Sequence, residues 1–155
     1  MKKIYRKKIL IVAYTKQDKR FLMVKDKDTN EWGFISGGVK KNETYYEAAL
    51  RELNEETSGI FETINKDDYY THKFKTDYRP DSLLAIDKQR NEIVESLYTI
   101  FFFPIPDDVS EEYNQFTIND EVIDIRVQQY EKFNNVWSFC NDIYNNIILS
   151  ENLLH

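Results

Sequence analysis

Apolar stretches separated by polar turns predict a strand-rich start to this chain. Residues 7–15 form an apolar, β-branched run bounded by lysines, which is typical of a buried strand. Residues 21–24 predict a second strand, which would pair with the first as a hairpin across 16–20. A turn is expected at 26–30, and a short strand at 32–35 that ends at a pair of glycines.

A helix is predicted to follow Gly37-Gly38. Thr44 and Glu47 have the spacing of a capping box, in which the threonine hydroxyl caps the first turn and the glutamate reaches back to the backbone. The alanines and leucines that follow are good helix formers. Gly59 is a natural stop just past the end of this helix.

The second half of the chain predicts more strands and two long loops. Residues 69–78 alternate aromatic and polar side chains, as a half-exposed strand does. Residues 93–103 are strongly apolar and end at Pro104, which indicates a central strand. The polar residues 77–90 and 107–120 are expected to form loops.

The last part of the chain predicts a strand and then a helix. Residues 121–127 read as the final strand, and we detect no internal repeat and no low-complexity linker, so a single domain over residues 1–155 is expected. Apolar side chains then recur at three- and four-residue steps, which favours a C-terminal helix. These side chains are Phe133, Val136, Trp137, Cys140, Ile143, Tyr144 and Ile147.

Composition agrees with a folded domain and argues against a broad nucleic-acid surface. The 155 residues are 41% hydrophobic and 15% aromatic, and the net charge is −6. Binding to nucleic acid needs cations that neutralise phosphates. A local basic stretch near the start is interpreted as a solvated entry to the first strand rather than a binding arm: Lys2, Lys3, Arg6, Lys7 and Lys8.

The single cysteine, Cys140, excludes an intramolecular disulfide and a cysteine-based zinc site. Because Cys140 falls in the apolar stripe of the C-terminal helix, we expect a small buried side chain rather than a nucleophile. The apolar run 9–13 is too short to span a membrane, and no cleavage signal follows it. A cytoplasmic protein with no membrane association is therefore expected.

The predicted helix carries an unusual cluster of carboxylates. Glu52, Glu55 and Glu56 have i, i+3, i+4 spacing, which places them on one helix face. Like charges so placed destabilise a helix by a few tenths of a kcal/mol per pair. Arg51 lies among them and is expected to orient carboxylates rather than bind substrate.

A divalent cation would relieve this repulsion. Mg²⁺ takes oxygen ligands and usually shares them with substrate phosphates, and the glycine loop lets the backbone approach those phosphates. Taken alone, the three glutamates favour an acidic surface helix. Together with Gly37, Gly38, Glu43 and Arg51 at these spacings, they favour a metal site for a pyrophosphate.

The whole pattern resembles the signature of the Nudix hydrolases. This signature is long and specific, although it covers only about a sixth of the chain. The resemblance implies an α/β fold, an α/β/α sandwich around a mixed β-sheet, and hydrolysis of a nucleoside diphosphate linked to another group with Mg²⁺ or Mn²⁺. The residues that match in register are Gly37, Glu43, Arg51, Glu52, Leu53, Glu55 and Glu56.

The resemblance also implies roles for single residues. Glu52, Glu55 and Glu56 become the metal ligands, with Glu52 also a candidate base. Arg51 and Glu43 become organisers of the loop and helix. Family members often use a further acid from a late loop, for which Glu121 lies in the right place. An exposed charge at the strand edge is an equally good interpretation of Glu121.

Two positions depart from the family pattern. The signature should end with a glycine and an aliphatic residue at positions 58 and 59, whereas this chain has Ser58-Gly59-Ile60. The terminal glycine is thus displaced by one residue, which changes the loop after the helix and leaves the ligands in place. Ser36 stands where many relatives have proline before the two glycines.

The signature leaves the substrate open. Trp32 and Phe34 could border a base pocket, although core packing is expected for at least one of them. A nucleoside triphosphate or a nucleoside diphosphate sugar is the first choice. Capped RNA, cleaved by decapping, is the alternative, and a non-catalytic nucleotide sensor is the alternative from another class. Either a monomer or a homodimer fits the resemblance.

Overall fold

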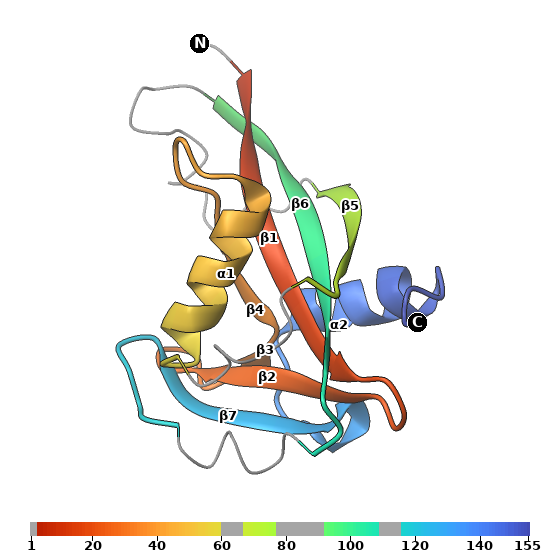
Figure 1. The fold of residues 1–155 in the computed structure, drawn as a ribbon. Coiled ribbons are helices and arrows are strands. Elements are labelled where there is room, and N and C mark those ends of the chain that lie inside the picture. Colours follow the sequence, from red (N-terminus) through yellow and green to blue (C-terminus); the bar gives the residue numbers. More distant parts are fainter. Residues whose placement is uncertain (1–2, 60–66, 77–91, 109–115) are drawn as a thin grey trace.

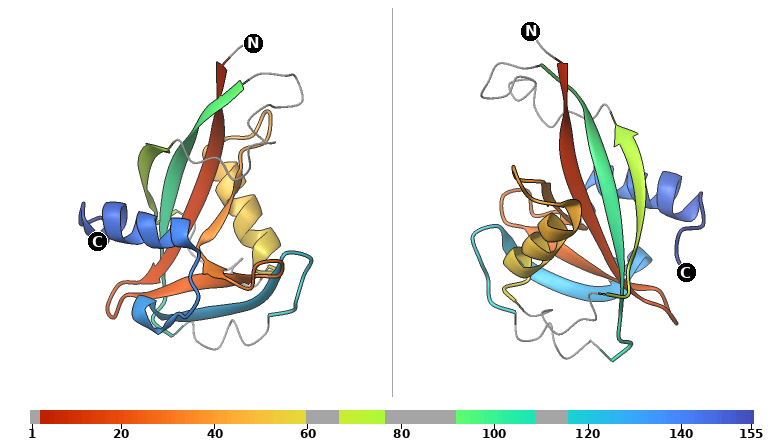
Figure 2. Two further views of the ribbon diagram at one scale, coloured as in Figure 1. Left: turned by 180° about the vertical axis from the view of Figure 1, so that it is seen from behind. Right: turned by 45° about the horizontal axis from the view of Figure 1, so that its top comes forward.

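The computed structural model describes residues 3–59, 67–76, 92–108 and 116–155. A seven-stranded mixed sheet runs through the molecule, with one helix on each face (Figures 1 and 2). This arrangement confirms the expected α/β/α sandwich around a mixed sheet. None of the described helices is long and apolar enough to cross a membrane.

The centre of the sheet is a long parallel pair. Strand β1 (Lys3–Thr15) lies beside β6 (Glu92–Ile105), and β5 (Tyr70–Thr76) continues the sheet antiparallel to β6. Strand β2 (Arg20–Asp26) forms the expected hairpin with β1. The strand predicted at 93–103 continues past Pro104 to Ile105, because the proline occupies a register position opposite Tyr14.

The short strand expected at 32–35 is in fact two strands with different partners. Strand β3 (Trp32–Gly33) pairs with β2, whereas β4 (Ile35–Gly38) pairs with β1. Phe34 therefore marks the point at which the chain leaves one partner for the other. Strand β7 (Val122–Gln129) pairs with β2 as well, so β2 and β7 diverge from the central pair in Figure 1.

Helix α1 (Tyr45–Glu56) begins as its sequence predicts. The Thr44 hydroxyl accepts a hydrogen bond from the Glu47 N–H at 3.0 Å, and the Glu47 carboxylate accepts one from the Thr44 N–H at 3.0 Å. Ala48, Ala49 and Leu53 are buried against the sheet. These contacts fix the helix over β1 and β4, and its acidic face is left beside the end of β4.

Two successive residues with positive φ follow the end of α1. Ser58 adopts a left-handed conformation with φ 55°, which a family glycine at this position would adopt without strain, and Gly59 follows with φ 80°. The Gly59 N–H donates to the Asn54 carbonyl at 2.9 Å, which closes a Schellman turn. The Ser58 hydroxyl donates to the Thr117 carbonyl at 3.0 Å, so this serine ties the helix end to a neighbouring segment.

The C-terminal helix is shorter than its apolar pattern predicts. Helix α2 covers Ser138–Ile143 and continues as a π-helical segment, Tyr144–Leu149. The expectation that Phe133, Val136 and Trp137 belong to this helix is wrong. The Phe133 N–H donates to the Tyr130 carbonyl at 3.1 Å. The segment around Val136 and Trp137 is held by β3: the Trp32 N–H donates to the Asn135 carbonyl at 3.0 Å, and the Trp137 N–H donates to the Trp32 carbonyl at 2.9 Å.

Side chains from alternate positions of β1 face two separate cores. Ile9 and Ile11 pack with α1, whereas Leu10 and Val12 pack with α2. Cys140 belongs to the second core, and burial raises the pKa of its thiol to about 12. The prediction of a small buried cysteine is therefore confirmed.

The two predicted loops lie largely outside the described residues. Residues 77–91 and 109–115 are not described, which leaves the expectation of a loop at 77–90 untested. The flanking residues 107–108 and 116–120 contain neither helix nor strand, as predicted.

Candidate functional site

The two glycines at the end of β4 have different surroundings. A Cβ atom on Gly37 would overlap the carboxylate of Glu52, whereas a Cβ on Gly38 would meet nothing within 4 Å. Only a glycine at position 37 leaves space for the Glu52 side chain to pass beside the strand. The sequence analysis did not distinguish the two glycines, whereas the structure shows that Gly37 lies against Glu52 and Gly38 does not.

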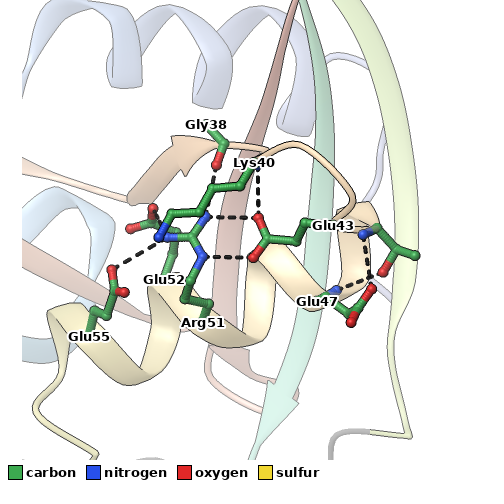
Figure 3. Close-up of polar contacts among 8 residues, drawn as sticks. Gly38, Lys40, Glu43, Glu47, Arg51, Glu52 and Glu55 are labelled. Carbon is green, nitrogen blue, oxygen red and sulfur yellow. Dashed lines mark hydrogen bonds and ion pairs between the residues drawn. The ribbon is translucent and has the colours of Figure 1, made fainter.

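Arg51 lies at the centre of the charged cluster, as Figure 3 shows. Its guanidinium donates to both carboxylate oxygens of Glu43, at 2.7 and 3.0 Å, and to Glu52 at 2.8 Å. A further bond at 2.9 Å goes to the Gly38 carbonyl, and a longer one at 3.4 Å goes to Glu55. A single arginine thereby links the glycine loop to the carboxylates of α1.

Glu43 is held firmly in this network. Besides the two bonds from Arg51, its carboxylate accepts a hydrogen bond from the Lys40 N–H at 2.9 Å (Figure 3). The hydrogen bonds from Arg51 and then from the Lys40 backbone lower the pKa of Glu43 to about 2. Glu43 therefore stays ionised and fixes the loop between β4 and α1.

Glu56 has the opposite environment. Burial is the main cause that raises the pKa of its carboxyl to about 9, and the charges of Glu52, Glu121, Glu55 and Asp26 add to the effect. Its Oε2 atom is buried and has no hydrogen-bond partner among the described residues. A buried carboxyl oxygen without a partner is costly, and a bound cation would satisfy it.

The pKa of Glu52 is subject to both kinds of influence, burial and a hydrogen bond from Arg51. Burial raises the pKa of its carboxyl, and its hydrogen bond from Arg51 acts in the opposite direction. Glu55 is 53% exposed. In the described part of the chain, no three acidic, histidine or cysteine side chains converge tightly enough to hold a metal as they stand. Glu52 and Glu55 accept hydrogen bonds from Arg51, whereas the Glu56 Oε2 atom has no partner among the described residues. Carboxylate oxygens of this kind fit a divalent cation, which would compete with Arg51 for Glu52 and Glu55.

Asn119 brings Glu121 to the end of α1. The Asn119 side-chain amide donates to the Glu56 carbonyl at 3.3 Å, and its oxygen accepts from the Glu121 N–H at 2.9 Å. Glu121 itself is exposed, and its charge contributes to the raised pKa of Glu56. The sequence analysis selected Glu121 and missed Asn119, because nothing local marks a residue that connects two distant segments.

A pocket of about 360 Å³ opens beside Glu56 and Glu121. Phe34 lines it, as the sequence analysis suggested. Trp32 is not among its lining residues and packs instead on Phe133, with ring centroids 5.3 Å apart. The other lining residues are Val24, Asp26, Thr29, Glu31, Gly33, Ser36, Val122 and Trp137.

Lys8 is a further cation that the sequence analysis assigned to a solvated strand entry. That expectation fits Lys7, which is exposed, but Lys8 is half-buried opposite Gly38. Burial is the main cause that lowers the pKa of Lys8, and the charges of Glu52 and Glu56 act in the opposite direction. Successive side chains of β1 point to opposite faces of the sheet, but which of Lys7 and Lys8 is half-buried becomes clear only once the pairing with β4 is known.

Comparison with known proteins is consistent with this geometry. The family model of the NUDIX domain matches residues 4–144. The chain belongs to the Nudix hydrolase family. Members of this family act on phosphoric anhydrides, and the glycine loop with α1 is the Nudix box of this chain.

One curated relative matches part of this Nudix domain. The dihydroneopterin triphosphate diphosphatase of Escherichia coli (strain K12) is 37% identical over 59 residues, which cover 36% of this chain and 39% of the relative. The match therefore spans well under half the length of that enzyme.

Two solved Nudix structures share the fold. The Escherichia coli dihydroneopterin triphosphate pyrophosphohydrolase has a TM-score of 0.61 and 19% identity, over 95% of this chain and 99% of that chain. A bifunctional NMN adenylyltransferase/ADP ribose pyrophosphatase from Francisella tularensis, complexed with AMP and a manganese ion, has a TM-score of 0.60 and 17% identity, over 96% of this chain and 42% of that chain. At these identities the likeness concerns the fold.

Replacing Arg51 by alanine is expected to destabilise the Nudix domain by about 2–4 kcal/mol, because it leaves two largely buried carboxylates, Glu43 and Glu52, without their partner. Arg51→Lys keeps the charge but cannot form the forked bonds, so it should recover part of the stability. Urea unfolding of both variants measures the effect. Equal stability of Arg51→Ala and the parent would show that the network contributes nothing.

Proposed function

We propose that this Nudix protein is a metal-dependent pyrophosphohydrolase that cleaves a small substrate resembling a nucleoside triphosphate. The observation that carries the proposal is the position of Glu56. Its Oε2 atom is buried with no hydrogen-bond partner among the described residues, and Glu56 lies at one wall of a pocket that also has aromatic lining residues. A ligand with a phosphate chain near Glu56 and a ring deeper in the same pocket would use both the acidic and the aromatic lining residues.

Glu52, Glu55 and Glu56 would hold the divalent cation, Mg²⁺ or Mn²⁺. All three project from the last two turns of α1, whose packing on the sheet makes the site rigid. When bound, the cation supplies charge neutralisation of the diphosphate and a water of lowered pKa. The carboxylates themselves supply the negative charge that retains the cation.

The remaining chemistry belongs to side chains around the site. Glu52 is the proposed general base, because burial makes its carboxyl a better proton acceptor than an ordinary glutamate. Arg51 fixes the orientation of Glu52 through a bond of 2.8 Å. Glu121 stands at the pocket wall as a second acid close to Glu56. Gly37 keeps the approach to Glu52 open.

The partial match to dihydroneopterin triphosphate diphosphatase supports a triphosphate rather than a nucleoside diphosphate sugar. The pocket of about 360 Å³ has the size of a small-ligand site. All charged side chains among its described lining residues are acidic, which does not favour a long polyanion such as capped RNA.

A hydrolysis screen tests the proposed function. The panel contains nucleoside triphosphates, dihydroneopterin triphosphate, nucleoside diphosphate sugars, dinucleoside polyphosphates and capped RNA, each with Mg²⁺ and with Mn²⁺. We expect release of pyrophosphate from a triphosphate, and loss of that release in Glu56→Gln. Binding of nucleotide without any turnover would support a sensor and contradict the proposal.

A further inference from the structure

The pocket beside Glu56 is lined by hydrogen-bond acceptors away from the metal-binding glutamates. Asp26 and Glu31 carry carboxylates, and no lysine, arginine or histidine is found among its lining residues in the described chain. The carboxylates that raise the pKa of Glu56 include Asp26 and Glu121. Glu31 precedes β3, whereas Glu52, Glu55 and Glu56 lie on α1, so Glu31 reaches the pocket from a different element.

The turn before β3 holds Glu31 in place. The Asp26 N–H donates to the Glu31 carbonyl at 2.9 Å, and the Glu31 N–H donates to the Thr29 hydroxyl at 3.3 Å. One oxygen of the Asp26 carboxylate accepts bonds from the backbone of Asp28 and Thr29 and from the Thr29 hydroxyl. Asp26 therefore builds the turn, whereas the Glu31 carboxylate has no partner among the described residues and is available to a ligand.

The same turn is attached to the segment that carries Trp137. The Asn135 side chain donates to the Asn30 carbonyl at 2.9 Å, and the backbone bonds of Trp32 to residues 135 and 137 continue the connection. Trp137 lies over Gly33, where an added Cβ would be 3.7 Å from its ring. Glu31, Phe34 and Trp137 thus belong to one connected unit, so a carboxylate and two aromatic side chains are presented to the pocket together.

We propose that Glu31 is a specificity-determining residue that recognises the 2-amino-4-oxo pyrimidine edge of a bicyclic ring, the edge shared by guanine and reduced pterins, while the ring lies against Phe34 and Trp137. This inference rests on the proposed function, which places the triphosphate of the same molecule at Glu56. We select this ring edge because of its pattern of hydrogen-bond donors.

A carboxylate discriminates strongly among heterocyclic rings. The 2-amino-4-oxo edge presents a ring N–H next to an amino group, so one carboxylate can accept two parallel hydrogen bonds. Adenine presents an acceptor nitrogen beside its amino group, and uracil presents one N–H between two carbonyl oxygens. Both would leave Glu31 facing an acceptor, which is unfavourable in a confined site.

GTP and ITP form a matched pair for the test, because ITP lacks only the 2-amino group. We expect the parent protein to prefer GTP to ITP in kcat/KM by roughly 10–100-fold, the value of one hydrogen bond to a charged group. In Glu31→Gln the preference should fall to within about threefold, since glutamine cannot accept two bonds in this arrangement. Dihydroneopterin triphosphate, compared with GTP, shows which of the two rings is preferred.

Asp28→Asn is the matched control. Asp28 is exposed in the same turn and does not line the pocket, so the variant removes one charge and should keep the preference of the parent protein. Equal use of GTP and ITP by the parent, or an unchanged ratio in Glu31→Gln, would overturn the inference and leave the proposed hydrolase intact.

Equilibrium binding separates the inference from turnover. Titration of the protein with GTP and with ITP in the presence of Ca²⁺ should show the same 10–100-fold preference in Kd and the same loss in Glu31→Gln. A protein that hydrolyses nothing but shows this preference would support the inference and contradict the proposed function. A protein that binds both nucleotides equally would contradict the inference, whatever it hydrolyses.

Discussion

Glu56→Gln is expected to lower turnover by about 10²–10³-fold, the range observed when one preorganised electrostatic group is removed from an active site. The same change should raise the melting temperature of the metal-free protein. The Oε2 atom of Glu56 is buried with no hydrogen-bond partner in the part of the chain that the structure describes, and burial and neighbouring carboxylates disfavour the ionised form of the side chain. A gain of about 1–2 kcal/mol in the free energy of unfolding corresponds to a rise of about 2–8 °C in the melting temperature of a domain of this size.

The stability gain should depend on pH. The pKa of Glu56 is raised from 4.5 to about 9 in the folded protein. Between these values the folded state retains a proton that the unfolded state has lost, so the parent protein loses stability as pH rises through this window. Glutamine cannot ionise. The advantage of Glu56→Gln in the absence of metal should therefore be larger at pH 9 than at pH 6.

Calorimetry in EDTA at both pH values, together with kcat in Mg²⁺, measures these effects. Asp28→Asn, which removes an exposed charge far from α1 in sequence, should leave both quantities unchanged. Addition of Mg²⁺ should stabilise the parent more than Glu56→Gln, because the variant has lost a ligand. If Glu56→Gln kept full activity, the assignment of the metal site to α1 would be wrong.

Gly37→Ala should reduce turnover by about 100-fold, because displacement of a catalytic group by about 1 Å has an effect of this size. The added methyl group would occupy the space of the Glu52 carboxylate. Glu52 would have to leave its position and its bond of 2.8 Å to Arg51. The side chain is flexible, so we expect a small change in the melting temperature beside the large change in kcat.

Gly38→Ala provides the control for this effect. A Cβ at position 38 meets nothing within 4 Å, and neither glycine has a positive φ, so alanine is compatible with the backbone there. Gly38→Ala should remain close to the parent in kcat and in melting temperature. Equal activity of the two alanine variants would show that the position of Glu52 does not matter for the reaction.

Local sequence determined the Nudix box and the helix that carries it. The capping box at Thr44 and Glu47 and the buried alanines depend on residues within a few turns of one another, so their spacing predicted α1 correctly. The register of Glu52, Glu55 and Glu56 follows from helical periodicity alone. The apolar runs of β1 and β6 identified the central strands for the same reason.

The tertiary structure decided the features that depend on partners distant in sequence. The chain divides into β3 and β4 because β2 and β1 offer separate edges. Trp137 leaves the predicted helix because its backbone bonds to Trp32. Periodicity along the chain carries no information about either partner.

The same limit applies to the site. Sequence spacing identified the carboxylates of the box, and the family resemblance added Glu121 as a candidate acid whose role stays a prediction. It could not show that Gly37 rather than Gly38 makes room for Glu52, that the Glu56 Oε2 atom is buried with no partner among the described residues, or that Glu31 and Trp137 share one pocket. Glu52, Glu55 and Glu56 lie on one helix, whereas the pocket is assembled from four separate segments of the chain that only folding brings together.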